Sequence, residues 1–264
     1  MCLISSMNES ELTQLAARQL ADYDAGEPGT SFRKLQLSLP EAYQVQSRVA
    51  ELREQRGEHF IGYKVGCTSP TIRRQLNIDH PVFGRLFDSD SWPSGTVLPA
   101  SRFCRLAIEG ELAVRLGQEV PSPNGSPETI ASAVEAVFPV IELHNLIFRR
   151  EAPSSAELIA NNAIHAGFVY DDSTSRSFDL EAATLDIRID GKPQAQVSGR
   201  ELANTVVQSL KWLAAELHGH ALFLQPGQTI LCGSVADLFP VPSQCSIVAS
   251  TDRYGSVACT VQET

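Results

Sequence analysis

The strongest constraint on the fold is a run of alternating residues at 105–116, with the sequence RLAIEGELAVRL. Its even positions carry leucine, isoleucine, valine and one glycine, whereas its odd positions carry arginine, glutamate and alanine. Successive side chains of a β-strand point to opposite faces of the sheet, so a period of two predicts a strand. The segment VFPVIEL at 137–143 is apolar except for one glutamate, which is typical of a strand buried on both faces. These two segments predict a β-rich core.

Helices are predicted before this core. The motifs NESE at 8–11 and SLPE at 38–41 match the capping box, in which two side chains satisfy free amides at a helix N-terminus. Apolar residues follow each motif at helical spacing. The pattern changes to strand-like alternation at 59–66. We therefore predict an α+β fold with a helical N-terminal segment at 1–58 and a β-rich catalytic core at 59–264, which together form one continuous unit.

The remaining core elements are predicted from the same two periodicities and from turn residues. The dipeptide Asp190-Gly191 between two alternating segments predicts a β-hairpin. Helices are expected at 127–136, 154–160 and 201–218, and strands at 164–170, 228–233, 245–250 and 256–262.

The net charge of −10 argues against nucleic acid or an anionic membrane surface as a partner, because both attract lysine and arginine patches. An acidic protein that binds an acidic substrate needs a local cation to reverse the field. No apolar run reaches about 18 residues, so no membrane-spanning helix is expected. The chain shows no signal-peptide pattern and its six cysteines lack zinc-site spacing, so a reduced, cytoplasmic protein is expected.

Three glutamates in the two core segments form a candidate metal site. Glu109 and Glu111 are two residues apart, so their side chains share one face of the strand, with Cα atoms roughly 6.5 Å apart. The alternative is a half-exposed strand whose glutamates pair with Arg105 and Arg115. Glu142 favours the metal site, because a buried carboxylate must be paired, protonated or bound to a cation. Carboxylate oxygens without cysteine or clear histidine partners suit Mg²⁺ or Mn²⁺ rather than zinc.

Lys64 is the second candidate, within the segment IGYKVG. It lies on the same strand face as Gly62 and Gly66, which leave that face with little side-chain cover. The residue is either an ordinary solvated lysine or one that reaches into a cleft that the glycines keep open.

Seven short motifs occur along the chain in a characteristic order: GYKVGCTS at 62–69, DHPVFG at 79–84, EGE at 109–111, IEL at 141–143, ANNA at 160–163, and the turns Gly233-Ser234 and Gly255-Ser256. In this order they resemble the motifs of the 2-hydroxypenta-2,4-dienoate (2-keto-4-pentenoate) hydratases and 4-oxalocrotonate decarboxylases of the fumarylacetoacetate hydrolase superfamily. The similarity runs from about residue 10 to the end of the sequence. Each motif alone is weak, but their joint order is specific.

The resemblance implies the family's mixed β core in a homo-oligomer, and an enzyme that acts on a small 2-oxo acid or dienoate. Glu109, Glu111 and Glu142 match the family's metal-ligand motif, for Mg²⁺ or Mn²⁺. Lys64 and Asp79 match its catalytic segments. Contacts to the substrate are expected from residues in or beside the matched motifs: Ser69, His144, Asn162, His165 and Ser234.

The chain departs from the family pattern beside the candidate site. Asn145 and Asn161 stand where the family usually has aspartate, and His144 and His165 stand where smaller residues are usual. A basic residue often precedes the first ligand, but Ala107 occupies that position. The loss of two carboxylates would alter proton transfer or the preferred charge of the substrate. His144 is either a polar contact or a packing residue with a hydrogen bond.

The leading hypothesis is hydration of a 2-hydroxy-2,4-dienoate to a 4-hydroxy-2-oxo acid. The cation would chelate the C1 carboxylate and the C2 oxygen, and Lys64 and Asp79 would move protons. Decarboxylation of 4-oxalocrotonate or a related 2-oxo-3-enedioate is the nearest alternative, and it needs a cationic anchor such as Arg73, Arg74 or Arg85. Tautomerisation of a 2-oxo acid is a third possibility. A fourth is a catalytically altered relative that binds metal and a 2-oxo acid without turnover.

Overall fold

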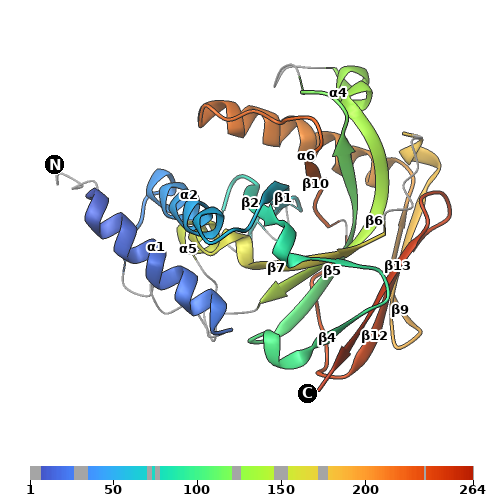
Figure 1. The fold of residues 1–264 in the computed structure, drawn as a ribbon. Coiled ribbons are helices and arrows are strands. Elements are labelled where there is room, and N and C mark those ends of the chain that lie inside the picture. The colour runs from blue at the N-terminus through green and yellow to red at the C-terminus, as the bar shows by residue number, and fades with distance from the viewer. Residues whose placement is uncertain are drawn as a thin grey trace.

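The structure, a computed structural model, describes residues 7–26, 35–69, 73–74, 78–120, 126–145, 154–171, 178–234 and 236–263. Its helices are α1 (Glu9–Asp24), α2 (Leu39–Gln55), α4 (Pro127–Ala133), α5 (Ser155–Ala160) and α6 (Arg200–Gly219). Its strands are β1 (Phe60–Gly66), β2 (Val82–Phe87), β3 (Ser91–Pro93), β4 (Thr96–Pro99), β5 (Leu106–Leu116), β6 (Val134–Asn145), β7 (His165–Tyr170), β8 (Thr184–Ile189), β9 (Lys192–Ser198), β10 (Thr229–Leu231), β11 (Phe239–Pro240), β12 (Cys245–Thr251) and β13 (Ser256–Gln262). Figure 1 shows the two sheets that these strands form and the helices beside them.

The two sheets are both mixed. The larger has the strand order β2-β1-β10-β5-β6-β7-β3, with β11 also paired to β5, and the smaller has the order β4-β13-β12-β8-β9. The sheets pack on each other, with β12 and β13 against β6 and with β8 against β5. Their approach is close at Gly110, where an added Cβ would lie 2.6 Å from the side chain of Ile187. The predicted α+β class with a mixed β core is confirmed.

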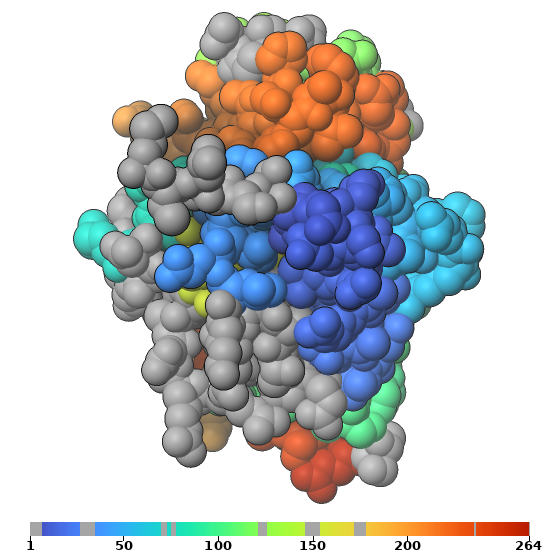
Figure 2. Space-filling view, turned by 90° about the vertical axis from the view of Figure 1, so that its left-hand side faces the viewer, coloured from blue at the N-terminus to red at the C-terminus, as the bar shows by residue number. Residues whose placement is uncertain are grey.

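The two N-terminal helices begin as the sequence predicts. Capping boxes join Asn8 to Glu11 at the start of α1 and Ser38 to Glu41 at the start of α2. Helix α1 packs on α2, and α2 packs on α5. Figure 2 shows the face of the molecule on which α1 and α2 lie beside α6. These helices therefore contact the core, and the division of the chain at residue 58 stays a prediction.

Most of the expected core elements are confirmed. The hairpin of β8 and β9 turns at Asp190 and Gly191, whose φ angles of 51° and 71° suit the predicted tight turn. The helix expected at 127–136 ends at Ala133, because β6 begins at Val134 and pairs with β5. The sequence pattern does not predict the short strands β2, β3, β4 and β11, because their pairing depends on partners that are distant in the sequence.

No helix in the described ranges is both long enough and apolar enough to cross a membrane.

Candidate metal centre

Strands β5 and β6 bring the candidate ligands together. In their antiparallel register, Glu109 lies directly opposite Glu142. Glu111 follows two residues later on the same face of β5, and its carboxyl group contacts that of Glu142. Opposite residues of antiparallel strands have Cβ atoms about 4.5–5.5 Å apart, so the facing carboxylates converge. The register thus places all three carboxylates in one cluster.

The cluster is largely closed to water. Glu111 and Glu142 are fully buried, whereas 19% of the Glu109 side chain is exposed. The backbone N–H of Gly233, two residues beyond β10, donates to Glu111 Oε2 at 2.5 Å. Within the described residues, Glu111 Oε1 and Glu142 Oε2 have no hydrogen-bond partner. Buried carboxylate oxygens without partners are costly, so these two atoms are suitable positions for binding a cation.

Lys64 reaches the cluster from β1, which β10 separates from β5. Its Nζ atom lies 3.1 Å from Glu142 Oε1, and only 2% of its side chain is exposed. An added Cβ would lie 3.1 Å from Lys64 Nζ at Gly66 and 3.1 Å from Lys64 Cγ at Gly84, so both glycines make room for the lysine. Gly62 has another role, since a Cβ there would overlap the backbone of β10. Lys64 is therefore a buried residue of the cluster, not a solvated lysine.

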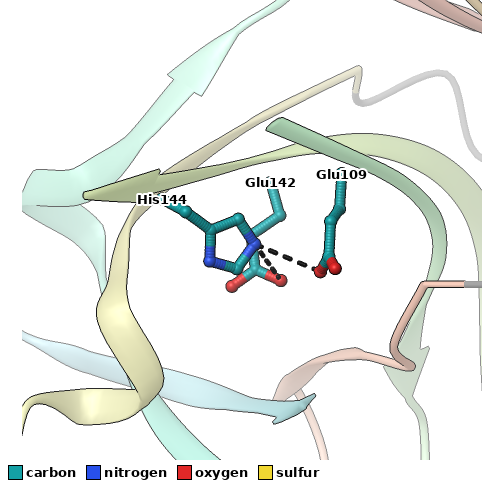
Figure 3. A group of neighbouring side chains, drawn as sticks. All are labelled: Glu109, Glu142 and His144. Carbon is teal, nitrogen blue, oxygen red and sulfur yellow. Dashed lines mark hydrogen bonds and ion pairs between the residues drawn. The ribbon is translucent and has the colours of Figure 1, made fainter. Parts of the chain in front are cut away.

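Two histidines contact the same carboxylates. His144 directs its Nε2 atom at Glu109 Oε2, 3.2 Å away, and at Glu142 Oε2, 3.4 Å away (Figure 3). His165, the first residue of β7, places Nδ1 2.7 Å from Glu142 Oε1. Ligand atoms of Glu109, Glu142 and His144 all lie within 4.8 Å of one another. No imidazole was predicted among the metal ligands from the sequence, although the spacing of two residues between Glu142 and His144 indicates a shared strand face.

The carboxyl groups of the cluster lie close enough to affect one another's charge, and the ammonium group of Lys64 lies 3.1 Å from Glu142 Oε1. Burial, and then the charge of Glu142, raise the pKa of Glu111 well above its ordinary value. Burial by itself lowers the pKa of His144, but the charges of Glu142 and Glu109 prevail and raise it to about 9. Both pKa shifts show that the cluster takes up positive charge, so its residues fit a divalent cation of the Mg²⁺ type.

Two other residues predicted for the site, Asp79 and Asn162, make contacts outside the carboxylate cluster. The side chain of Asp79 is 95% exposed, and its Oδ1 atom lies 3.6 Å from His80 Nε2, so it is not among the buried carboxylates. Its catalytic role stays a prediction.

Asn162 accepts a hydrogen bond from the backbone N–H of Arg85 at 2.7 Å and donates to the Arg85 carbonyl at 2.9 Å. It thereby ties the turn before His165 to β2, and its predicted contact to substrate stays a prediction.

A cavity of about 470 Å³ opens between the turn after β1 and helix α6. Ser69 and Ser234, both predicted to bind substrate, line this cavity together with Arg73 and Trp212. Most of the residues that line the cavity are of polar types, and Arg73 is among those predicted from the sequence as an anchor for a second carboxylate.

The cavity lies beside the carboxylate cluster. The backbone N–H of Gly233 donates to Glu111, and the next residue, Ser234, lines the cavity. Thr68 also lines the cavity, and its hydroxyl donates to the Ser234 carbonyl at 3.2 Å. Burial raises the pKa of the neighbouring Cys67 thiol to about 11.

No family model matches this chain. A 2-hydroxyhexa-2,4-dienoate hydratase of Comamonas testosteroni is 29% identical over 87% of this chain and 88% of that protein. A 2-keto-4-pentenoate hydratase of Burkholderia vietnamiensis is 27% identical over 84% of this chain and 86% of that protein. The solved structure of 4-oxalocrotonate decarboxylase from Pseudomonas putida G7, complexed with magnesium and adipate, matches with a TM-score of 0.87 and 21% identity over 96% of this chain and 98% of that chain.

The chain shares the fold of this decarboxylase structure. Over most of its length it is also similar in sequence to hydratases of 2-hydroxyhexa-2,4-dienoate and 2-keto-4-pentenoate, which confirms the resemblance found in the sequence. The decarboxylase structure holds magnesium, an ion that prefers oxygen ligands such as those of the cluster described above.

Proposed function

We propose that this chain is a metal-dependent hydro-lyase that adds water to a 2-hydroxy-2,4-dienoate of the 2-keto-4-pentenoate type and releases a 4-hydroxy-2-oxo acid. The observation that carries the proposal is the position of Glu142. Its carboxylate is fully buried, faces Glu109 across the strand pair, and lies 3.1 Å from Lys64 Nζ. The two relatives described above are named as hydratases of substrates of this class, which supports the same assignment here.

The chemistry divides between the cation and the chain. Glu109, Glu111 and Glu142 would hold a divalent cation, which would act as an electrophile toward the carboxylate and the 2-oxygen of the substrate. Lys64 holds a proton at Nζ inside the closed cluster and can deliver it to the substrate. His165 orients Glu142 through the contact at 2.7 Å, so the carboxylate is positioned before substrate binds.

Proton transfer in the proposed reaction has two steps. C5 of the dienoate takes a proton as the 2-hydroxyl becomes a 2-oxo group, and the C3–C4 double bond that results is electron-poor. The oxygen of water then adds at C4, and a proton is placed at C3, so the net change is one molecule of water. The buried ammonium of Lys64 is the proton source that we propose for these steps, and its contact with Glu142 supports this role. The tail of the substrate, beyond C4, is proposed to occupy the cavity lined by Ser69 and Ser234.

Decarboxylation of a 2-oxo-3-enedioate is the second candidate, and Arg73 is the observation that favours it. The guanidinium lines the cavity beside the cluster, where it can hold a second carboxylate. The solved decarboxylase structure contains adipate, a dicarboxylate, together with magnesium. Both reactions use the same chelate, so the carboxylate cluster does not separate them.

A substrate panel tests the proposal. The protein is treated with EDTA, dialysed, and assayed against 2-hydroxypenta-2,4-dienoate and 4-oxalocrotonate with and without added Mg²⁺ or Mn²⁺. We expect ultraviolet loss of the pentadienoate, a product heavier by one water, and activity that depends on added metal. Release of CO₂ from 4-oxalocrotonate without hydration would favour the second candidate. Full turnover without metal would contradict the proposal, and tight oxalate binding without any turnover would favour a non-catalytic relative.

We also propose that the protein is cytoplasmic and forms a homo-oligomer. Both expectations come from the sequence and its resemblance to the family. Light scattering after size-exclusion chromatography tests the second, and a monomer at micromolar concentration would contradict it.

A further inference from the structure

We propose that His144 is itself a metal ligand, so that the centre is a mixed nitrogen and oxygen site that favours first-row transition ions over Mg²⁺. This inference rests on the proposed function, because it concerns the cation of the same cluster. It differs from the assignment made from the sequence, in which Glu109, Glu111 and Glu142 form a site of oxygen ligands alone.

The distances in the cluster agree with a shared ion. His144 Nε2 lies 3.2 Å from Glu109 Oε2 and 3.4 Å from Glu142 Oε2. Two neighbouring ligands of an octahedral ion, each about 2.1 Å from the metal, lie about 3.0 Å apart. The ligand atoms of the three residues also lie within 4.8 Å of one another, so one ion can reach all of them. Figure 3 shows the imidazole nitrogen directed at both carboxylates.

The contacts of the two Glu142 oxygens indicate which atoms remain for binding the ion. Glu142 Oε1 already has two donors, His165 Nδ1 at 2.7 Å and Lys64 Nζ at 3.1 Å. Glu142 Oε2 has no hydrogen-bond partner within the described part of the chain, and it is the oxygen that faces His144. An ion that replaces the Nε2 proton leaves an imidazole protonated at Nδ1, whose Nε2 lone pair is directed at the point where these atoms converge.

The position of His144 is also rigid. Its side chain is only 4% exposed, and it lies on the face of β6 that carries Glu142. Strand β6 pairs with β5 on one side and with β7 on the other, so the backbone of His144 is held from both sides. A ligand on a doubly paired central strand is placed more precisely than one on a loop.

An imidazole changes which ions the site prefers. Carboxylate ligands suit Mg²⁺ and Mn²⁺, whereas imidazole suits the later first-row ions, whose affinity for nitrogen rises along the series from Mn²⁺ to Co²⁺ and Ni²⁺. We therefore expect the protein to bind Co²⁺ at least tenfold more tightly than its His144→Gln variant does. Mg²⁺ affinity is expected to change less than threefold, because Mg²⁺ gains little from nitrogen.

The direct test is pulsed electron paramagnetic resonance of the Mn²⁺-loaded full-length protein. We expect modulation from one directly coordinated imidazole nitrogen, which changes to the ¹⁵N pattern when the protein is labelled with ¹⁵N-histidine. This measurement uses the wild-type protein, so it does not depend on whether a variant folds. The label also separates histidine from Lys64 as the source of nitrogen.

Matched variants identify the histidine. The nitrogen signal should be lost in His144→Gln and retained in His165→Gln, because His165 contacts Glu142 and not the point where the ligands converge. A nitrogen signal that is absent from the wild-type protein, or that survives in His144→Gln, overturns the inference, as does failure to bind Mn²⁺. Mg²⁺-dependent hydration without coordinated nitrogen would leave the proposed function intact and reject only this inference. Coordinated nitrogen in a protein without turnover would support this inference and contradict the proposed function.

Discussion

Lys64 Nζ lies 3.1 Å from Glu142 Oε1, and both side chains are almost completely buried. Burial by itself lowers the pKa of Lys64, but the charges of Glu142, Glu109 and Glu111 prevail and raise the pKa above its usual range. The lysine is therefore an ammonium ion at neutral pH. It neutralises part of the cluster and stores a proton in it.

The first prediction is that Lys64→Met abolishes most of the activity and destabilises the protein. A lost proton donor typically lowers the rate by about 10²–10⁴-fold. Removal of one partner of a buried ion pair costs about 3–5 kcal/mol, and Glu142 would lose the ammonium group that lies 3.1 Å away. Steady-state kinetics and urea unfolding of the metal-free protein measure both effects. Lys192→Met, at an exposed position on β9, is the control and should change neither quantity. An active, stable Lys64→Met protein would refute this role.

The second prediction concerns the contact between the two sheets. A methyl group at Gly110 would lie 2.6 Å from two side-chain atoms of Ile187, so Gly110→Ala should lower the free energy of unfolding by about 1–3 kcal/mol. Ile187→Ala makes room for the added methyl group. The double variant should therefore lose less unfolding free energy than the sum of the losses in the two single variants. Gly219→Ala is the control, since nothing lies within 4 Å of its added Cβ. If the two losses of unfolding free energy simply add, Gly110 and Ile187 are not in contact and the prediction is wrong.

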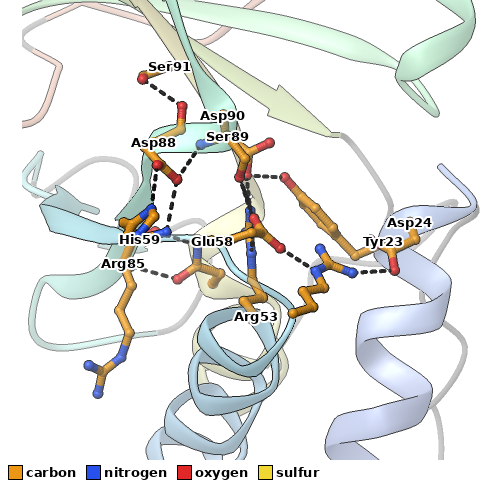
Figure 4. A network of polar contacts seen from close by, with 12 residues as sticks. Tyr23, Asp24, Arg53, Glu58, His59, Arg85, Asp88, Ser89, Asp90 and Ser91 are labelled. Atoms are coloured by element: carbon orange, nitrogen blue, oxygen red, sulfur yellow. Dashed lines mark hydrogen bonds and ion pairs between the residues drawn. The ribbon is translucent and has the colours of Figure 1, made fainter.

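A second polar network anchors the N-terminal helices, and Figure 4 shows its members. Arg53 of α2 donates from Nε to Glu58 Oε2 at 2.9 Å and also pairs with the buried Asp90. Tyr23 of α1 donates to Asp90 Oδ2 at 2.7 Å. One buried guanidinium therefore holds α1, α2 and the segment after β2 together.

The third prediction is that Glu58 stabilises the fold above acidic pH. Burial raises the pKa of Glu58, but hydrogen bonds from Arg53, Ser89 and Arg56 outweigh it, and the pKa is lowered. A lowered folded-state pKa stabilises the protein above the unfolded value of about 4.3, and this stabilisation is lost as pH falls through the folded-state pKa. Denaturant unfolding at several pH values between 3 and 7 gives the free energy of unfolding of wild type and of Glu58→Gln. The difference between the two free energies should become smaller as the pH falls. Two parallel stability curves would argue against this prediction.

The fourth prediction concerns an asparagine that stands where the family usually has aspartate. Asn161 accepts from Gln19 Nε2 at 2.6 Å and donates from Nδ2 to the Glu157 carbonyl at 2.8 Å. Asn161→Asp removes the donor and leaves that carbonyl facing a carboxylate, so we expect a loss of about 1–3 kcal/mol in unfolding free energy. Asn145→Asp is the matched variant, because the side-chain hydrogen bond of Asn145 within the described residues is one that its Oδ1 accepts, from the Cys104 N–H at 3.2 Å, and an aspartate keeps this acceptor. Equal stabilities of Asn161→Asp and wild type would contradict the prediction.

Local patterns predicted much of the fold. The capping boxes at Ser38 and Asn8 act within four residues, so their sequence alone places the helix starts. The alternation in 105–116 predicts β5 for the same reason, since side-chain direction in a strand depends only on position. Strand β2 shows the limit, because it lies in a short segment that becomes a strand only by pairing with β1.

The candidate site was predictable in part. Glu109 and Glu111 share a face by spacing, and Glu142 stood out because a charge interrupts an apolar strand. The position of His144 among the ligand atoms was not predicted, although its distance of two residues from Glu142 carries the information. The exposure of Asp79 could not be predicted, since it depends on how a loop packs after the strands have formed.

The sequence by itself determined the helix starts, the alternating strands and the residue types that can bind a hard cation. Only the tertiary structure decided that Glu142 faces Glu109, that Lys64 reaches Glu142 from β1, which pairs in parallel with β10, and that an imidazole contacts both glutamates. The physical reason is that strand register joins residues far apart in the chain. Shifting a strand by one residue would turn every one of its side chains to the other face, and no local pattern states which register is adopted.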